Sequence, residues 1–276
     1  MPKLDAHQHF WDLERFPYPW LSPAVTPLYR NFLPADLAQH LAACGIDGTV
    51  VVQATHSTAE TQWLLSLARD TPFIKGVVAW FDLTAPDLTA QLEAALASGP
   101  LCGVRHQVHD EPDPAWLLQE PVLRGLRAIA AAGLPYDLLV RPSHLPILPR
   151  LFEAVPQGSW VIDHIAKPAM GRGVMQPWLN ELRRVARYEN VSCKLSGLIT
   201  EAGPGWSAET IKPYVDEVLE LFGPARLMFG SDWPVCELAG SYEQVHDLIA
   251  QFVESLSPGE QDAIWSGAAR RVYHLR

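Results

Sequence analysis

The stretch Leu4-Asp5-Ala6-His7-Gln8-His9, near the beginning of the chain, is a short apolar run that carries two histidines. Residues two apart in a strand point to the same side, so the imidazoles of His7 and His9 would aim at one point. A doubly wound open sheet usually has a glycine-rich phosphate turn after its first strand, and here the chain reads Ala-His-Gln-His instead. The stretch therefore argues against that open sheet.

Further apolar runs recur along the whole chain. Each is short, rich in Val, Ile, Leu or aromatic residues, and nearly continuous, as strands covered on both faces are. The eight runs are residues 4–9, 49–54, 74–81, 101–108, 136–140, 160–165, 191–198 and 227–230. Helix-length segments with apolar residues three or four apart separate them, for example 61–68, 88–96, 179–188 and 242–256. Eight strands alternating with helices predict a closed parallel (β/α)8 barrel of the TIM type.

Capping signals agree with these helices. Ser57 is followed three residues later by Glu60, Ser241 by Gln244, and Ser257 by Glu260. Each pair is typical of the reciprocal cap that opens a helix. We find no Gly/Ser tract, charge run or low-complexity stretch, so we expect residues 1–276 to form a single barrel domain.

Composition restricts the partners that we expect. A net charge of −10 lacks the basic footprint that nucleic-acid binding needs, which favours a small-molecule partner. The four cysteines match no zinc or redox pattern and are typical of buried thiols in a reducing compartment. We find neither the apolar core of a signal peptide nor a membrane span, and we expect a cytoplasmic protein without membrane contact. Nothing in the sequence indicates the oligomeric state.

The ends of the predicted strands are polar although their bodies are apolar. Barrel enzymes place their chemistry at the C-terminal ends of the strands, so these groups would meet at one mouth. They are His7 and His9, Gln53 with Thr55 and His56, Trp80 with Asp82, Arg105 with His106 and Gln107, Arg141, Asp163 with His164 and Lys167, Lys194 with Ser196, and Ser231 with Asp232. We interpret this mouth as a reaction centre.

Several of these motifs resemble those of a known family. They are Asp5-Ala6-His7-Gln8-His9-Phe10-Trp11, Tyr18-Pro19-Trp20, Gly103-Val104-Arg105-His106-Gln107, Asp163-His164-Ile165-Ala166-Lys167-Pro168, Cys193-Lys194-Leu195-Ser196-Gly197-Leu198, Gly230-Ser231-Asp232-Trp233-Pro234-Val235 and Gly267-Ala268-Ala269-Arg270-Arg271-Val272-Tyr273. Together they resemble the amidohydrolase superfamily, in its amidohydrolase-2 or lactonase branch, and within it the L-fuconolactone and L-rhamnonolactone hydrolases. The resemblance implies hydrolysis of a sugar lactone to its open-chain acid.

The resemblance also shows where this chain departs from binuclear relatives. Those relatives bridge two metals with a lysine after the fourth strand, where this chain has Arg105 and His106. The set that remains is His7, His9, His164 and Asp232, which could hold one zinc or manganese ion. It could equally work without metal, because the resemblance implies a branch that contains metal-independent members. We expect that a metal is not essential.

The chemistry of lactone opening assigns roles to these residues. Asp232 would be the general base for water, and His7, His9 and His164 would polarise the carbonyl directly or through one metal. Arg105, His106, Lys194 and Gln53 would bind the substrate through polar contacts, and Trp11, Trp80 and Trp233 would supply flat apolar faces. The proline-rich stretch 10–33 is expected to form an ordered loop over the pocket mouth. His56, His109 and His144 are interpreted as surface or supporting residues.

Two other functions remain open at this point. One is a mononuclear zinc-dependent decarboxylase, or another hydrolase of the same superfamily, and zinc content with carbon dioxide release would identify the decarboxylase. The other is a non-catalytic sugar-acid binding protein, which would bind such acids without turning over a lactone. The intact set of three histidines and Asp232 argues against the second.

Overall fold

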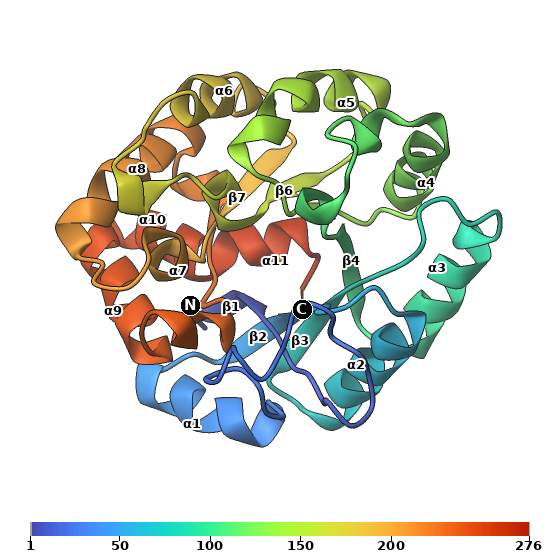
Figure 1. Cartoon of the computed structure of the whole chain (residues 1–276), viewed down its shortest axis with the longest axis horizontal. Coiled ribbons are helices and arrows are strands. Elements are labelled where there is room, and N and C mark those ends of the chain that lie inside the picture. Colours follow the sequence, from blue (N-terminus) through green and yellow to red (C-terminus); the bar gives the residue numbers. More distant parts are fainter. Residues whose placement is uncertain (1, 276) are drawn as a thin grey trace.

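The strands form one eight-stranded parallel sheet in a computed structural model that describes residues 2–275. Neighbouring strands in the sheet are neighbours in the chain, in the order β1 to β8 (Figure 1). The strands are β1 Leu4–Gln8, β2 Gly48–Val52, β3 Ile74–Ala79, β4 Leu101–His106, β5 Tyr136–Leu138, β6 Trp160–Ile162, β7 Val191–Leu195 and β8 Leu227–Phe229. Each lies within, or within one residue of, its predicted run. The predicted parallel (β/α)8 barrel is confirmed.

The backbone closes the sheet between β8 and β1. Asp232 N–H donates to the carbonyl of His7 at 2.8 Å, and His9 N–H donates to the carbonyl of Trp233 at 2.7 Å. Gly230 makes this close approach possible, because a Cβ atom there would lie 2.7 Å from Cβ of His7. The closure brings the first and last strand ends, and their polar residues, side by side.

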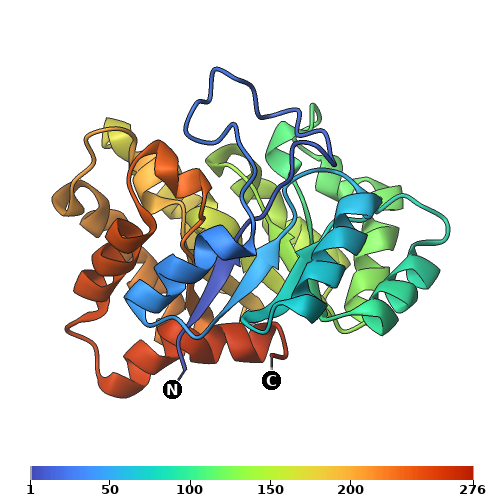
Figure 2. The same cartoon turned by 90° about the horizontal axis from the view of Figure 1, so that it is seen from below.

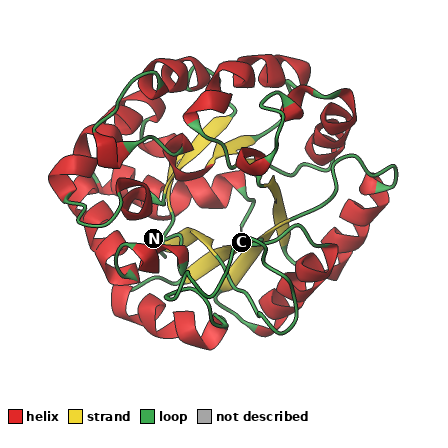
Figure 3. Ribbon diagram, in the orientation of Figure 1, coloured by secondary structure: helices red, strands yellow, loops and turns green. Residues whose placement is uncertain are grey.

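Helices surround the barrel and cover its outer face (Figures 1 and 3). In the described part of the chain they are α1 Pro34–Cys44, α2 Thr58–Asp70, α3 Leu88–Ser98, α4 Glu120–Ala131, α5 Leu148–Ala154, α6 Trp178–Val185, α7 Leu198–Ala202, α8 Ala208–Phe222, α9 Tyr242–Val253, α10 Pro258–Asp262 and α11 Ala268–Val272. None of the helices within residues 2–275 is long and apolar enough to cross a membrane. The helix α11 lies across the end of the barrel at which the chain begins (Figure 2).

Two of the three predicted capping boxes are confirmed, at Ser241 with Gln244 and at Ser257 with Glu260. The third prediction was half right. Ser57 Oγ does accept the N–H of Glu60 at the start of α2, but the Glu60 carboxylate accepts the N–H groups of Ala54 and Thr55 instead of that of Ser57. A buried carboxylate binds whichever backbone donors lack partners, and here these lie in the β2–α2 loop.

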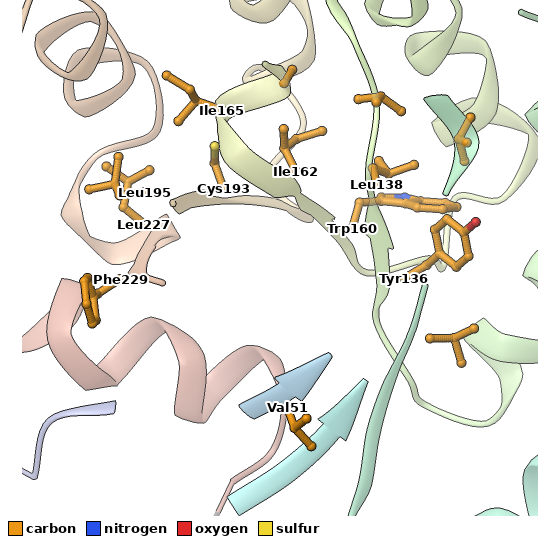
Figure 4. Close-up of a cluster of buried hydrophobic side chains, with 14 of the residues drawn as sticks. Val51, Tyr136, Leu138, Trp160, Ile162, Ile165, Cys193, Leu195, Leu227 and Phe229 are labelled. Carbon is orange, nitrogen blue, oxygen red and sulfur yellow. The ribbon is translucent and has the colours of Figure 1, made fainter. Parts of the chain in front are cut away.

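Apolar side chains fill the layer between the sheet and the helices. Figure 4 shows part of this cluster, with Tyr136, Trp160 and Leu195 among the labelled residues. The residues between them in the strands, such as Asp137 and Lys194, point to the other side, into the barrel. The interior of the barrel is therefore partly polar, while the outer layer is apolar.

The predicted loop over residues 10–33 is irregular and ordered, and it lies at the end of the barrel opposite the chain termini (Figure 2). An isolated bridge between Trp11 and Phe32 ties its two ends together. Near its tip, Trp20 Nε1 donates to the carbonyl of Ala54 at 2.8 Å, and the carbonyl of Pro17 accepts from Thr55 Oγ1 at 3.0 Å. These bonds hold the loop against the C-terminal end of β2.

Candidate active site

Three imidazoles surround one carboxylate at the C-terminal mouth of the barrel. The Oδ1 atom of Asp232 lies 3.7 Å from Nε2 of His7, 3.5 Å from Nε2 of His9 and 3.9 Å from Nε2 of His164. All four side chains are buried. The structure thus brings together the four residues for which the sequence predicts catalytic or metal-binding roles.

A β-bulge aims His7 into the barrel. Between the pairs Asp5–Thr49 and Gln8–Val51, β1 advances three residues while β2 advances two. Before the bulge, Asp5 accepts from Tyr242 of the outer helix α9 at 3.2 Å. Within the bulge, His7 turns to the interior, where it contacts Lys194 and Arg105, and His9 reaches Asp232 at the same mouth.

An unusual backbone places His164 in the mouth. The four residues from His164 to Lys167 all have positive φ, between 46° and 61°. Such a run is strained in residues other than glycine and is typical of functional sites. Gly197 leaves room for the ring, because a Cβ atom there would lie 2.7 Å from Nδ1 of His164. Nδ1 of the ring hydrogen-bonds Oγ of Ser196 at 2.9 Å, and the other ring nitrogen, Nε2, faces Asp232.

A hydrogen bond to a carbonyl determines which ring nitrogen of His9 carries the proton. His9 Nδ1 lies 2.7 Å from the carbonyl of Val52, which can only accept, so Nδ1 is protonated and Nε2 of the neutral ring is a lone pair. Lys194 has only hydrogens to donate, and its Nζ lies 3.1 Å from Nδ1 of His7. That nitrogen also lies 3.3 Å from the acceptor Oδ1 of Asp163, while Nε2 of His7 lies 3.2 Å from Nε2 of His9 and 3.3 Å from the donor Nη1 of Arg105, so the contacts of His7 select neither tautomer. The neutral His9 ring therefore has no N–H for a substrate carbonyl oxygen, and of the two predicted modes, direct or through a metal, the direct one does not fit its tautomer.

Burial sets the charge of these groups. It lowers the pKa of His7 and His164 well below their ordinary 6.5, and it lowers the pKa of His9 as well. Burial alone would raise the pKa of Asp232, but His164 and His9 outweigh it, and the pKa lies below 3.8. At neutral pH the centre therefore consists of neutral imidazoles around an ionised carboxylate.

A network of four buried charges lies beneath this centre. Lys194 Nζ lies 2.5 Å from Oδ2 of Asp137 and 3.1 Å from Oδ1 of Asp163, and Arg105 Nη1 donates to Oδ2 of Asp163 at 3.1 Å. Burial would raise the pKa of Asp163, but Lys194 outweighs it and holds this pKa well below its ordinary value. The two cations and two carboxylates balance, and Tyr273 donates to Asp137 from below at 2.9 Å.

The mouth contains a cavity of about 230 Å³ above the imidazoles. This volume is below the roughly 300–1,000 Å³ typical of sites for drug-sized ligands, and it suits a ligand the size of a single sugar. Its lining residues come from the ends of several strands and from the loop after β1. They are His9, Trp20, Ala54, Arg105, Gln107, His109, Asp110, Leu139, His164, Lys167, Asp232 and Val235.

Of the predicted substrate-binding residues, Arg105 lines this cavity. Lys194 does not, because it is fully buried in the charge network. Gln53 is also covered, and its side chain bonds Arg105 at 2.9 Å and Gln107 at 2.8 Å. Both therefore support lining residues and lack a surface facing the cavity.

The aromatic rings that were predicted to face the substrate are placed elsewhere. Trp11 and Trp233 are buried, and each packs against Phe32. Trp80 Nε1 donates to Nδ1 of His106 at 3.0 Å. The His106 ring in turn stacks between His56 and Trp116, with ring centroids 4.2 and 4.4 Å away. None of these rings is among the described residues that line the cavity.

Several residues of the cavity and its floor were not predicted. His109 was interpreted as a surface or supporting residue, yet it lines the cavity next to Asp110. Trp20 was expected in the covering loop, and the structure makes it part of the wall. The sequence does indicate a role for Asp137, because an aspartate inside the apolar run 136–140 needs a buried partner. The sequence contains one weak indication for His109, which is that it stands two residues after Gln107 at the end of a predicted strand.

The donor set fits a single divalent cation. The Nδ1–H of His9 donates to the carbonyl of Val52, as the second nitrogen of a metal-bound histidine commonly does, and Oδ1 of Asp232 lies within 3.9 Å of Nε2 of both His9 and His164. His7, His9 and Asp232 offer atoms within 4.8 Å of one another. One neighbour competes with such an ion, because Arg105 Nη1 lies 3.3 Å from Nε2 of His7.

Comparison with known proteins shows the family. Residues 4–275 match the amidohydrolase family. The chain is similar to L-fucono-1,5-lactonase of Burkholderia ambifaria, with 38% identity over 279 residues, and to that of Burkholderia multivorans, with 40% identity over 286 residues. Both alignments cover 99% of this chain and 96% of the relative.

Two crystal structures of an amidohydrolase from Burkholderia multivorans are also similar to this chain. One contains bound HEPES and superposes with a TM-score of 0.95, and the other contains bound zinc and superposes with a TM-score of 0.94. Both are 38% identical to this chain and cover 100% of it, as it covers 100% of them.

Proposed function

This chain belongs to the amidohydrolase family, and from this premise we propose that it hydrolyses a sugar lactone, such as L-fucono-1,5-lactone, to the open-chain acid. The observation that carries the proposal is Asp232, an ionised carboxylate that faces a sugar-sized cavity among neutral imidazoles. Similarity over the full length to two L-fucono-1,5-lactonases supports the same reaction. The partner is then a small sugar lactone.

Asp232 is the general base in this proposal. Its carboxylate takes a proton from water as the water oxygen forms a bond to the lactone carbonyl carbon. The lone pair on Nε2 of His9, 3.5 Å from Asp232, orients the same water by accepting its second hydrogen. When the ring C–O bond breaks, Asp232 returns the proton to the ring oxygen, which becomes a hydroxyl group. The product is the open-chain acid.

Donors on the cavity wall stabilise the oxyanion. Arg105 and Lys167 are cations that line the cavity, and His164 also lines it, with its Nε2 3.9 Å from Oδ1 of Asp232. Hydrogen bonds to Gln53 and Asp163 hold the Arg105 guanidinium in one orientation. Removing one donor of this kind typically costs about 10²–10³ in rate.

A bound divalent cation would be held by His7, His9, His164 and Asp232. It would supply Lewis-acid polarisation of the carbonyl and a more acidic water. In our proposal the chain's own residues carry the proton transfer and the stabilisation of charge, and a metal is not required.

Acid release from a panel of aldonolactones, followed with a pH indicator, tests the proposal. We expect release from six-membered sugar lactones, and a lower rate with simple esters because these lack hydroxyl groups. Assays on the same preparation before and after chelation, with metal content measured, determine whether a metal takes part. A purified, folded protein that releases acid from no lactone on the panel would overturn the proposed function.

A further inference from the structure

Two polar residues on the cavity wall have no part in the chemistry described above. His109 and Asp110 belong to the short 3₁₀ turn Val108–Asp110 that follows β4, and both line the cavity. Their backbone is held in place, because His109 N–H donates to the carbonyl of Leu139 at 3.2 Å and Asp110 N–H to that of Gln107 at 3.1 Å. The turn is thus a fixed part of the wall.

The barrel places this pair opposite the general base. β4 and β8 are four strands apart in the closed order of eight, so their ends face each other across the mouth. Asp232 follows β8, and His109 follows β4. A ligand whose ester group lies at Asp232 extends towards His109 and Asp110 with the rest of its ring.

The proton of His109 belongs on Nε2. Nδ1 is buried, and it has no hydrogen-bond partner among residues 2–275. A buried N–H without a partner is costlier and rarer than an acceptor without one, so Nδ1 is the bare nitrogen. Burial lowers the pKa of His109 to about 4, which leaves the ring neutral at pH 7. The side chain is 15% exposed, and the edge that carries the Nε2–H is the one free to meet the cavity.

Nε2 of His109 lies 3.3 Å from Oδ1 of Asp110. A charge-assisted hydrogen bond is typically about 2.7–2.9 Å long, so this contact leaves both groups able to bind another partner. The cations on the wall, Arg105 and Lys167, are assigned to the oxyanion in the proposed function, so they do not account for a ring hydroxyl. A donor beside an acceptor matches a hydroxyl group, which accepts from the N–H and donates to the carboxylate.

We propose that His109 and Asp110 form a subsite for a ring hydroxyl of the substrate, on the wall opposite Asp232. The proposal rests on the proposed function and extends it from the reacting ester to the polyhydroxylated part of the ring. It assigns the selectivity for sugar lactones over plain lactones to this pair.

The experiment compares two substrates in the whole protein. One is L-fucono-1,5-lactone, and the other is δ-valerolactone, which has the same ring size and no hydroxyl groups. The variants are His109→Phe, which keeps the ring shape without the N–H, and Asp110→Ala, at a side chain that is 61% exposed and tolerates change. We expect the ratio of the two kcat/KM values to fall by about 10- to 100-fold in each variant, mostly through KM for the sugar lactone.

His246→Phe is the matched control. His246 pairs with Asp247, the next residue, at 2.9 Å, and its other ring nitrogen is buried without a hydrogen-bond partner in the described chain, as in His109. It lies on α9 and packs against Trp265, away from the cavity. We expect the wild-type ratio in this variant.

Binding of the open-chain acid, L-fuconate, measured by calorimetry, separates the subsite from the reaction. Weaker binding in His109→Phe and Asp110→Ala than in the wild type and in His246→Phe supports the subsite. Equal affinity in all four proteins, or a wild-type substrate ratio in both cavity variants, overturns it. A wild type that binds L-fuconate through this pair and opens no lactone would overturn the proposed function alone.

Discussion

Asp232 combines a strained backbone with an ionised side chain. Its φ is 56°, a left-handed conformation that is uncommon outside glycine, asparagine and aspartate. The backbone bond from its N–H to His7 holds that conformation, and the carboxylate is thereby directed towards the imidazoles. A residue that costs conformational energy in this way is typically retained for its chemistry.

Asp232→Asn is expected to remain folded and to lose about 10³-fold or more in kcat on the sugar lactone, because the amide cannot accept the proton of water. Initial rates together with circular dichroism and Tm measure both effects. Glu237→Gln is the control, since that carboxyl bonds Trp233 nearby and does not line the cavity. A folded Asn variant with the wild-type kcat would exclude Asp232 as the base.

Lys194→Met tests the buried charge network. Without the Lys194 cation, the buried carboxylates of Asp137 and Asp163 lose one of the two positive charges that compensate them. The free energy of unfolding should therefore fall by about 3–5 kcal/mol. Activity should fall too, since Lys194 orients His7. Urea denaturation measures the first effect and kcat/KM the second.

The control for that prediction is Lys212→Met, at an exposed ion pair with Asp216, which should change stability by less than about 1 kcal/mol. The double variant Lys194→Met with Asp137→Leu restores the charge balance and should recover part of the lost stability. Equal stability of Lys194→Met and the wild type would contradict the network as described.

At the scale of elements, one carboxylate links the β2–α2 loop to helix α2. Glu60 stands in the first turn of α2 and binds the N–H groups of Ala54 and Thr55 at 3.0 and 3.2 Å. Ala54 also lines the cavity and bonds Trp20 of the covering loop. The position of the loop therefore depends on a buried acidic group.

Burial raises the pKa of Glu60 from 4.5 to about 7, so the native state holds a proton that the unfolded chain releases. This contribution to stability is fully present below about pH 4.5 and is lost as the pH rises towards 7, by a total of roughly 3 kcal/mol. Glu60→Gln should therefore flatten the fall of Tm between pH 5 and 8. Thermal unfolding across that range measures it, with Glu93→Gln on the exposed side of α3 as the control. Parallel Tm profiles for the wild type and Glu60→Gln would contradict this pKa.

At the scale of the whole molecule, closure of the barrel assembles the centre from distant parts of the chain. His7 lies in β1 and His9 follows it, His164 follows β6 and Asp232 follows β8. The same assembly brings Arg105 and Lys194 to either side of His7, at 3.3 and 3.1 Å from its ring nitrogens. Both groups are donors directed at a ring nitrogen of His7, so they compete with a divalent cation for its lone pairs.

We therefore expect that chelator-treated protein keeps most of its lactonase activity. Metal content by mass spectrometry and initial rates before and after chelation measure this, with zinc or manganese added back. If activity disappears with the metal and returns with it, the metal-free mechanism is wrong, and His7, His9, His164 and Asp232 are ligands of a mononuclear site.

The sequence by itself determined the barrel, because strand and helix periodicity and the apolar character of each run are local properties. It also indicated His7, His9, His164 and Asp232, since polar groups at the ends of apolar strands must meet at one mouth. Tertiary structure decided what faces the cavity. Lys194 proved to be a buried partner of two carboxylates, and His109 a wall residue, because side-chain neighbours come from strands far apart in the chain. The bulge in β1 likewise depends on pairing with β2, and no local pattern records it.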